Sequence, residues 1–352
     1  MKNSQAPKKI LVIQTAFIGD VVLTTPMLFA IKKCFPNSYL CILVKPEAKG
    51  ILEHLPFVDE VLVIDKKRKH RFLGMLSIIY LIRKKKFDVL LAPHQSLRTG
   101  IISFFSGIPY RVGYKTSALP FVYHKKLIRT KKHEIHRLID FVKESLCSDL
   151  NYLTNAPILE ETEKSKKEAK KLLENFHTKP IAFACSSVWA TKRWTPWGFA
   201  ELAGILIEKY RAPVILIGSK EDYELSEYIK NYAKHIYPEK YYKQIYNFCG
   251  KTDLITLFSL LKNCRLLVSN DSAPIHFACA AKIPVVTILG PTTKDLGYAP
   301  ISENTAVVEI ENLYCRPCGT HGNQKCPEKH FRCMKEITPL MVLNKINQLR
   351  IP

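Results

Sequence analysis

Short apolar runs that alternate with helical stretches are the feature that most constrains how this 352-residue chain can fold. Runs rich in Val, Ile and Leu at residues 10–13, 40–44, 61–64 and 89–91 are typical of strands buried on both faces. A helix is expected over residues 21–35, between the first two runs. This alternation predicts an α/β fold with a parallel sheet covered by helices on both faces.

The pattern breaks near residues 148–180, where Pro157 precedes a charged, helix-forming stretch, and then begins again. The second series comprises strands at 181–184, 214–217, 266–268 and 285–289 and a helix over 196–210. We therefore expect two doubly wound, Rossmann-like domains, 1–157 and 178–335, that face each other across a cleft. Residues 336–352 are expected to form a helix that packs back on the first domain. Sheets of this kind bind ligands at the carboxyl ends of their strands, so the chemistry should lie in the loops that follow them.

Basic residues are concentrated in the first part of the chain. Residues 1–150 hold 26 Lys and Arg against 11 Asp and Glu, a net charge of +15 out of +22 for the whole chain. Nucleic acid, anionic lipid and phosphorylated glycolipid would all be attracted by this charge. A basic nucleic-acid-binding protein is one candidate, but the aromatic residues do not interleave with the basic runs as base-stacking platforms would. We therefore expect no nucleic acid as partner.

No apolar signal-peptide core precedes the first strand, so we expect a chain that is not exported. The longest apolar run, residues 72–82, is shorter than the roughly 20 residues of a transmembrane helix. Basic clusters flank it, formed by Lys66, Lys67, Arg68 and Lys69 on one side and by Lys84, Lys85 and Lys86 on the other. Two interpretations stay open: a buried helix with solvated ends, or a membrane-facing helix whose cations bind anionic lipid or phosphates.

The eleven cysteines fall into two groups. Seven occur singly in apolar surroundings, where we expect small core residues that stay reduced: Cys34, Cys41, Cys147, Cys185, Cys249, Cys264 and Cys279. The other four form a Cys-x₂-Cys-x₇-Cys-x₆-Cys run: Cys315, Cys318, Cys326 and Cys333. Their spacing suits a tetrahedral structural zinc, but we favour reduced thiols and expect no catalytic metal.

Asp20 is the candidate catalytic residue of the first domain. It lies in the turn between the first strand and the first helix, next to Gly19. This turn lacks the three-glycine dinucleotide fingerprint, which weighs against a dehydrogenase. Asp20 stands where a helix N-cap would be, so it is either a capping residue or a carboxylate that faces the cleft as a general base.

Lys192 and Arg193 precede a helix whose start is predicted from Thr195 and Pro196. A basic pair in this position either holds phosphate or is an ordinary solvated pair. Asp271 and Ser272 lie in a later strand-end loop that leads into another predicted helix. The backbone N–H groups of this loop, together with the dipole of that helix, would bind phosphate.

His276, about one turn into that helix, would face the same ligand. The loop at residues 289–293 is either a simple Gly-Pro turn or brings the Thr292 hydroxyl to the same phosphates.

Four motifs in this order resemble those of the ADP-heptose:lipopolysaccharide heptosyltransferases, glycosyltransferase family nine, which have the GT-B architecture. They are Gly-Asp-(apolar)₃-Thr-x-Pro, Lys-Arg-Trp-x-Pro-x₂-Phe-Ala-Glu-Leu, Ser-Asn-Asp-Ser-x-Pro-x-His and Leu-Gly-Pro-Thr. The resemblance implies inverting, metal-independent transfer of heptose from ADP-L-glycero-D-manno-heptose to the inner core of lipopolysaccharide, without a cofactor. Addition of the second heptose is favoured, because the Asn-Asp-Ser helix start and the cysteine-rich tail resemble that branch. The alternative is a GT-B transferase that uses another nucleotide sugar or acceptor.

The resemblance also assigns roles to residues. Asp20 matches the general base and Lys192 the catalytic, phosphate-contacting lysine. The implied donor-binding residues are Ser187, Lys192, Glu221, Asp222, Asp271, Ser272, Ala273, His276 and Thr292. The sequence departs from the family in having Ala184-Cys185 in place of Pro-Gly and Ala273 in place of a frequent Gly.

The implied partners are ADP-heptose and a lipid A–Kdo/heptose core acceptor. We expect the enzyme in the cytoplasm, on the inner face of the inner membrane, with the basic cluster at residues 66–86 in peripheral contact with anionic lipid.

Overall fold

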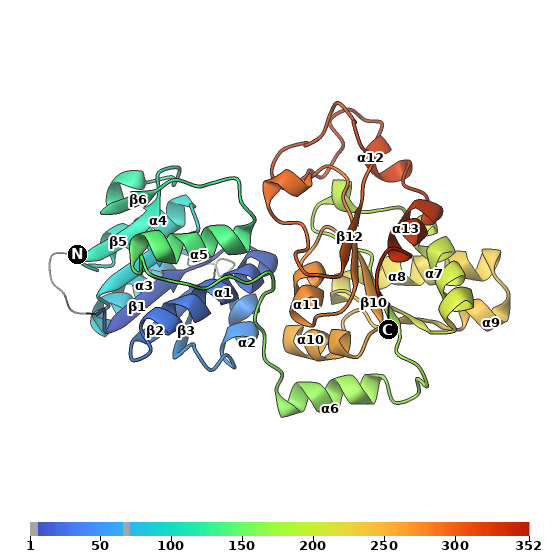
Figure 1. Ribbon diagram of the computed structural model, residues 1–352, viewed down its shortest axis with the longest axis horizontal. Helices are drawn as coiled ribbons and strands as arrows, with labels where there is room; N and C mark the ends of the chain where they lie inside the picture. The colour runs from blue at the N-terminus through green and yellow to red at the C-terminus, as the bar shows by residue number, and fades with distance from the viewer. Residues whose placement is uncertain (1–5, 66–70, 352) are drawn as a thin grey trace. The chain divides into compact units, whose positions relative to one another are not determined.

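The structure is a computed structural model that describes residues 6–65 and 71–351, and the side chains of 71 and 72 are not described. The chain forms two compact units, Met1–Glu160 and Glu161–Pro352. Each unit has one six-stranded sheet (Figure 1). Every pair of neighbouring strands in both sheets is parallel, as the near-continuous apolar runs predict.

The sheet of the first unit has the order β3-β2-β1-β4-β5-β6. Its strands are β1 (Lys9–Ile13), β2 (Tyr39–Val44), β3 (Glu60–Val63), β4 (Val89–Ala92), β5 (Tyr110–Tyr114) and β6 (Lys125–Leu127). The first four were expected. β5 and β6 were missed because they carry Arg, Gly and Lys and lie at one side of the sheet, where burial demands fewer apolar residues.

Helices cover both faces of this sheet. They are α1 (Ile18–Cys34), α2 (Lys49–Leu52), α3 (Arg71–Lys85), α4 (Leu97–Phe105) and α5 (Glu134–Ser145). α3 and α4 bury Ile79, Ile82 and Ile102 in one core cluster with Leu11 and Ile13 of β1. α1 and α5 pack on each other and contribute nothing to that cluster, so they cover the opposite face. Among the described helices, none has the length and apolar character needed to cross a bilayer.

The sheet of the second unit has the order β12-β11-β10-β7-β8-β9. Its strands are β7 (Ile181–Ala184), β8 (Val214–Leu216), β9 (Ile245–Asn247), β10 (Leu266–Asn270), β11 (Val285–Ile288) and β12 (Thr305–Val308). Its helices are α6 (Glu163–Leu172), α7 (Pro196–Tyr210), α8 (Tyr223–Ile236), α9 (Glu239–Tyr242), α10 (Leu254–Lys262), α11 (Pro274–Ala280), α12 (Arg332–Lys335) and α13 (Pro339–Ile346). The four strands and the helix predicted from the sequence are present, and β9 and β12 were missed.

The end of the chain differs from expectation. Residues 336–352 were expected to return to the first domain, but α13 packs against α7 and β12 of the second unit. Val342 and Ile346 are fully buried in the core of that unit. The apolar face of α13 completes this core, and the sequence alone gave no sign of which core it would join.

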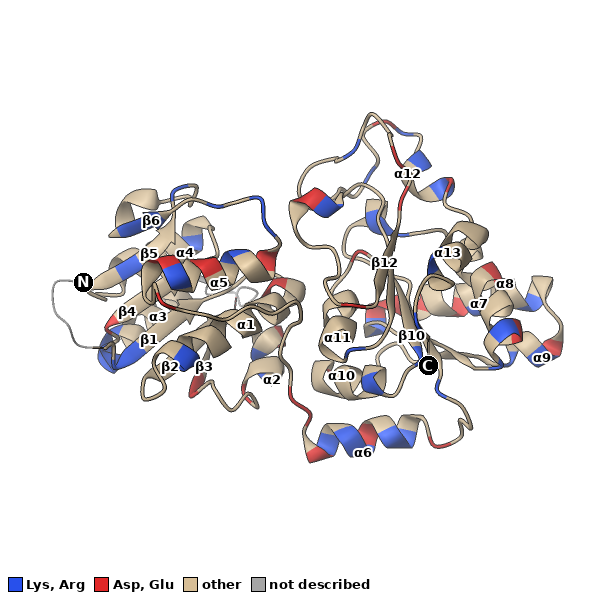
Figure 2. Cartoon of the chain, in the orientation of Figure 1, with Lys and Arg blue, Asp and Glu red and all other residues tan. Residues whose placement is uncertain are grey.

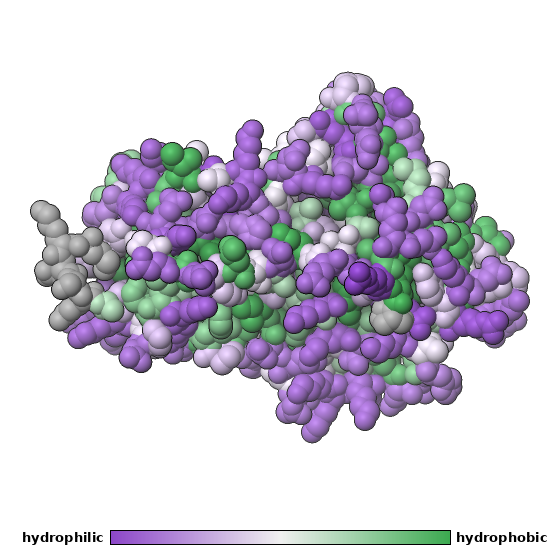
Figure 3. All heavy atoms as spheres, viewed as in Figure 1, coloured by the Kyte–Doolittle hydropathy of each residue, from purple (hydrophilic) through white to green (hydrophobic). Residues whose placement is uncertain are grey.

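The segment expected to link the domains contains α6, which belongs to the second unit. Its surface is almost entirely charged, as the blue and red residues in Figure 2 and the hydrophilic spheres in Figure 3 show. α6 packs against α10 through two buried polar contacts. The hydroxyls of Ser165 and Ser259 lie 2.7 Å apart, and the hydroxyl of Thr256 donates to Glu168 at 2.8 Å.

The cysteines follow expectation in part. Cys41, Cys185, Cys249, Cys264 and Cys279 are buried and free.

The expectation was wrong for Cys34 and Cys147, which form a disulfide. Cys34 ends α1 and Cys147 follows α5, and these helices lie side by side on the same face of the sheet. Their Cα atoms are therefore only 6.4 Å apart, within the range a disulfide spans. A separation of 113 residues hid this proximity in the sequence.

We expect the denatured protein, purified without reductant, to show nine reactive thiols out of eleven cysteines. Reductant should restore all eleven. The Cys34→Ser variant should lower the free energy of unfolding, by roughly 5 kcal/mol at most on the chain-entropy estimate for so long a loop. Thiol titration and denaturant melts measure both effects, and eleven reactive thiols before reduction would disprove the disulfide.

Candidate functional site

Asp20 lies in the first turn of α1, three residues after the N-cap position that was predicted for it. The N-cap is Phe17, and Asp20 is the third helical residue. The backbone N–H of Phe17 donates to Asp20 Oδ2 at 3.1 Å, so the carboxylate does satisfy one donor at the helix start. Asp20 thus stabilises the helix start, as the capping interpretation foresaw, but from the third helical position and not from the N-cap.

Burial and, after it, the negative charge of Glu134 together raise the pKa of Asp20 to about 6. The hydrogen bond from Phe17 and the positive charge of Arg129 act in the opposite direction. Because an ideal general base has a pKa near the working pH, this environment suits proton abstraction close to neutrality.

Glu134, which the sequence did not single out, is the first residue of α5 and is buried. Its carboxylate accepts from Arg129 at 3.0 Å and from Nε of Arg137 at 2.7 Å. Two guanidinium groups thus form ion pairs with the carboxylate whose negative charge acts on Asp20. Arg137 is itself buried, so the network is fixed by packing as well as by charge.

A hydroxyl cluster around His94 is a second feature that sequence reasoning missed. His94 follows β4, and its Nδ1 lies 3.1 Å from the hydroxyl of Thr15 and 3.2 Å from that of Thr99. The Ser96 hydroxyl is 3.4 Å away. Thr15 follows β1, the neighbour of β4, so this cluster lies at the same carboxyl edge of the sheet as the turn that carries Asp20. The sequence feature that could have identified this cluster is the group of polar residues directly after the buried strand β4.

In the second unit the structure brings together three residues predicted from separate loops. Lys192 Nζ lies 2.6 Å from Asp271 Oδ2, and the Thr292 hydroxyl donates to the same oxygen at 2.7 Å. Lys192 and Thr292 are buried, and only about a tenth of the Asp271 side chain is exposed. A positive charge held this far from water is positioned to stabilise a bound anion.

Asn270 fixes the backbone around this ion pair. Its side-chain carbonyl accepts from the N–H of Trp194 at 2.9 Å, and its amide donates to the carbonyl of Cys185 at 2.7 Å. The hydrogen bond to Cys185 fixes the backbone at Ala184-Cys185, the position where the family often has Pro-Gly. The next predicted residue, Ser187, is buried, and its carbonyl accepts from Arg193 Nε at 2.8 Å.

The predicted phosphate-binding helix start offers fewer available backbone N–H groups than expected. α11 has only seven residues, and the N–H groups of Ile275 and His276 donate to Ser272 and Ala273 within the first turn. In the described backbone, the N–H groups of Ser272 and Ala273 have no carbonyl acceptor, and Pro274 has no N–H. Two backbone amides therefore remain to bind a phosphate at this helix start. His276 is buried one turn later.

The structure separates the two candidate ribose ligands, Glu221 and Asp222. Asp222 Oδ2 accepts from both the N–H and the hydroxyl of Ser219 at 2.8 Å, so it stabilises the turn after β8. Glu221 is exposed in the same turn. Of the two carboxylates, Glu221 is therefore the better candidate to bind a ligand.

The cysteine-rich segment packs directly on the Lys192 loop, which the sequence did not indicate. Thr191 donates its hydroxyl to the carbonyl of Asn323 at 2.8 Å, and the Asn323 N–H donates back at 2.8 Å. Gly322 has a φ of +84°, and a Cβ there would lie 3.3 Å from the Lys192 side chain. A glycine is required at this close approach, which covers part of Lys192.

Across residues 6–65 and 71–351, no three His, Cys, Asp or Glu side chains converge as metal ligands would. Burial raises the pKa of Cys333 to about 12 and also raises that of Cys318. The Cys318 thiol donates to the carbonyl of Cys315 at 2.9 Å. Neighbouring cysteines of the run contribute to both increases.

The predicted basic cluster is only partly described. Lys66, Lys67, Arg68 and Lys69 lie outside the described residues. Lys84 and Lys86 are exposed near the end of α3, but Lys85 lies 2.8 Å from Glu60 and is half-buried in that ion pair. Lys85 is thus a structural residue of the first unit.

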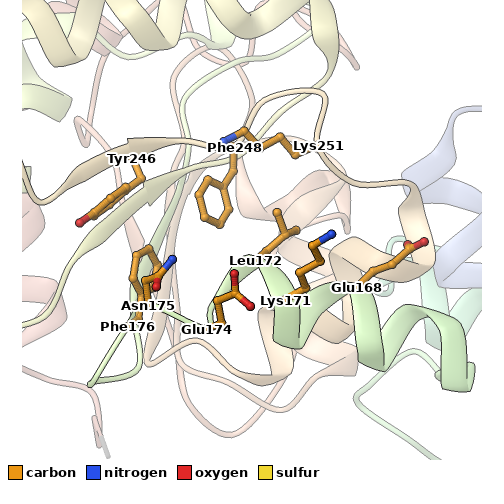
Figure 4. A pocket seen from close by; sticks show the side chains of 9 residues that line it. All are labelled: Glu168, Lys171, Leu172, Glu174, Asn175, Phe176, Tyr246, Phe248 and Lys251. Carbon is orange, nitrogen blue, oxygen red and sulfur yellow. The ribbon is translucent and has the colours of Figure 1, made fainter.

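A pocket of about 550 Å³ in the second unit contains none of the residues predicted to bind a ligand. Its lining is Glu168, Lys171, Leu172, Glu174, Asn175, Phe176, Tyr246, Phe248 and Lys251 (Figure 4). The rings of Phe176 and Tyr246 are 4.8 Å apart, and Lys251 lies over the ring of Phe248. These residues come from the second half of α6, the chain after it and the region of β9, so the pocket is bounded by an edge strand. The strand-end loops, where charged groups converge, therefore remain the candidate functional site, and this pocket is not part of it.

Comparison with known proteins identifies the family of the chain. The sequence model of glycosyltransferase family 9 (heptosyltransferase) matches residues 75–330. Lipooligosaccharide heptosyltransferase 2 of Haemophilus influenzae is 25% identical over 358 residues, which cover 97% of this chain and 99% of the relative.

Two solved structures share the fold over 97% of this chain. The ADP-heptose lipopolysaccharide heptosyltransferase II of Escherichia coli has a TM-score of 0.78 at 23% identity, with 98% of its chain covered. A family 9 glycosyl transferase from Veillonella parvula has a TM-score of 0.84 at 22% identity, with 96% covered. The likeness shows that the chain has the GT-B fold predicted from the sequence, in which each unit is Rossmann-like.

The Glu134→Gln variant should lower the pKa of Asp20 below about 6. A neighbouring negative charge favours the neutral acid and raises its pKa, so removing that charge must lower it. Carboxyl NMR titration measures the shift. Glu60→Gln is the matched control, because Glu60 is also ion-paired within the first unit but is not among the charges that act on Asp20. An unchanged pKa in Glu134→Gln would contradict the coupling.

Proposed function

Because the chain belongs to glycosyltransferase family 9, we propose that it transfers heptose from ADP-L-glycero-D-manno-heptose to the inner core of lipopolysaccharide. We further propose that transfer inverts the anomeric carbon and uses no metal ion. Support for the donor comes from the Escherichia coli structure, which is described as an ADP-heptose lipopolysaccharide heptosyltransferase.

The observation that carries the proposal is the Asp20 carboxylate, with a pKa of about 6, at the carboxyl edge of the first sheet. Inverting transfer needs one base and no covalent intermediate. Asp20 takes the proton of the acceptor hydroxyl as its oxygen attacks the anomeric carbon. The bond from that carbon to the diphosphate oxygen breaks on the opposite side, and ADP leaves with the electron pair.

The second unit supplies the groups for the leaving ADP. Negative charge develops on the diphosphate as the glycosidic bond breaks, and the buried Lys192 ammonium stabilises it. The amides of Ser272 and Ala273 add hydrogen bonds to the phosphates, and the Thr292 hydroxyl adds another when it turns from Asp271 to the ligand. Glu221 binds the ribose hydroxyls. Lys192 thus supplies the positive charge that a divalent ion provides in other transferases.

The proposed acceptor is a lipid A–Kdo core that already carries the first heptose. The matching relative is named heptosyltransferase 2, which supports addition of the second sugar. A phosphorylated, lipid-anchored acceptor is also consistent with the net charge of +15 on residues 1–150. We place the reaction in the cytoplasm, at the inner face of the inner membrane, without nucleic acid or cofactor.

The decisive experiment measures product mass with ADP-heptose and defined lipid A–Kdo acceptors, with and without one heptose, in EDTA. The wild type should add one heptose to the heptose-bearing acceptor. Asp20→Asn should reduce turnover roughly 10²- to 10⁴-fold, the usual contribution of a general base, because an amide cannot accept the proton. Donor affinity should stay unchanged in this variant.

An Asp20→Asn enzyme within a few-fold of wild-type turnover would leave Asp20 with its capping role alone. Activity that is lost in EDTA and restored by Mg²⁺ would overturn the metal-independent mechanism.

Lys192→Ala should weaken ADP binding and slow transfer together, since its charge acts on the ground state and more strongly on the transition state. Titration calorimetry with ADP and steady-state kinetics measure the two effects. Lys234→Ala, an exposed lysine on α8 of the same unit, is the matched control and should alter neither. Unchanged affinity and turnover in Lys192→Ala would remove it from the site.

A further inference from the structure

α3 exposes an apolar stripe that its packing in the fold does not explain. Leu73, Leu76 and Tyr80 are 59%, 45% and 70% exposed. Their spacing of three and four residues places them on one face of the helix. Ile79 and Ile82 lie on the opposite face and are buried against the sheet. The interpretation as a buried helix therefore holds for one face, and the other face is an exposed apolar surface.

α4 extends this surface with two aromatic residues. Phe104 and Phe105 are 53% and 52% exposed, and their ring centroids lie 5.0 Å apart. The two helices pack side by side on the same face of the sheet. At their ends, a Cβ on Gly107 would lie 3.4 Å from Arg83 Nε, so the Arg83 side of α3 adjoins the end of α4.

We name the five residues Leu73, Leu76, Tyr80, Phe104 and Phe105 the α3–α4 surface. Arg83 follows Leu76 by two helical turns, which places both on the side of α3 that faces α4.

The exposed charged side chains at the described end of α3 all have one sign, and Glu60 beside them is paired with Lys85. Arg83, Lys84 and Lys86 are exposed at the end of α3. Neither residues 71–87 nor residues 97–107 contain an Asp or Glu. An exposed apolar patch with a purely cationic border is complementary to a surface that is apolar inside and anionic outside.

We propose that the α3–α4 surface docks on an anionic lipid bilayer, with its apolar side chains at the boundary between headgroups and acyl chains. The helices lie in the plane of the interface and do not cross it. Tyr80 is suited to the headgroup level, because its ring is apolar and its hydroxyl is polar. Lys84 and Lys86 bury their methylene stems and reach the lipid phosphates with their ammonium groups.

A membrane fits this surface better than a second copy of the chain. A symmetric contact between two copies would bring the cationic borders together and oppose association. Contact with anionic lipid has no such repulsion, because the cationic border is attracted to the lipid phosphates. The inference rests on the proposed function in one respect: docking brings the enzyme to a lipid-anchored acceptor.

Sedimentation with vesicles of phosphatidylglycerol and phosphatidylethanolamine tests the proposal. The variant Leu73→Gln/Leu76→Gln/Tyr80→Ser and the variant Phe104→Ser/Phe105→Ser should each bind at least about ten-fold more weakly than wild type, since both lose buried apolar area. At roughly 0.5 M salt, where charge attraction is screened, the wild type should keep part of its binding and the variants should lose theirs.

The matched controls are Tyr228→Ser and Leu340→Gln in the second unit, at positions that are 59% and 62% exposed. They should bind vesicles as wild type does. Circular dichroism and thermal melts must show that every variant is folded. Vesicles of phosphatidylcholine alone should bind wild type weakly, because they offer no net negative charge.

Two outcomes would overturn the proposal. Either both variants sediment with anionic vesicles as wild type does, or the wild type forms a dimer that the variants lose while vesicle binding is unchanged. Transfer to a water-soluble core oligosaccharide separates this proposal from the proposed function. The surface variants should match wild type in that assay. If wild type binds vesicles as expected but transfers nothing, the proposed function fails and the docking surface stands.

Discussion

Parallel pairing of buried strands is the constraint on which the rest of this structure depends. β1 lies between β2 and β4, and β10 lies between β7 and β11, with every neighbour running in the same direction. In a parallel sheet all strands end at one edge, so the loops that follow them are neighbours regardless of their separation in sequence. This is why Lys192, Asp271 and Thr292, spread over a hundred residues, meet within hydrogen-bonding distance.

The same constraint decides what could be predicted from the sequence. The central strands of both sheets are long apolar runs, and the residues at their ends were identified because polar groups follow directly. β6 and β9 are three-residue edge strands with Lys, Tyr or Asn, so burial leaves almost no pattern in them. The exact place of Asp20 within α1 depends on which backbone N–H begins the helix, and Phe17 gives no capping signal.

Contacts between distant segments were the hardest to foresee. Glu134 acts on Asp20 only because α1 and α5 pack together, and no local motif marks a residue for its effect on a carboxylate more than a hundred positions away. The contact of Asn323 with Thr191 joins segments 132 residues apart. The four clustered cysteines drew attention to a metal, whereas the contacts that define this segment are made by its Asn, Gly and Arg residues. Arg316, for instance, donates to the carbonyl of Thr292 at 2.8 Å.

The ion pair between Lys192 and Asp271 has a consequence for selectivity. A buried cation with its own counterion is electrically satisfied before any ligand arrives, so an incoming anion must compete with a carboxylate that is already in place. A singly charged anion that merely replaces Asp271 gains little. A diphosphate can approach Lys192 and at the same time accept hydrogen bonds from the amides of the α11 turn, so it is favoured by the number of its acceptors rather than by charge alone. Under the proposed function, the pair would therefore favour a ligand with many acceptor oxygens over one that offers a single negative charge.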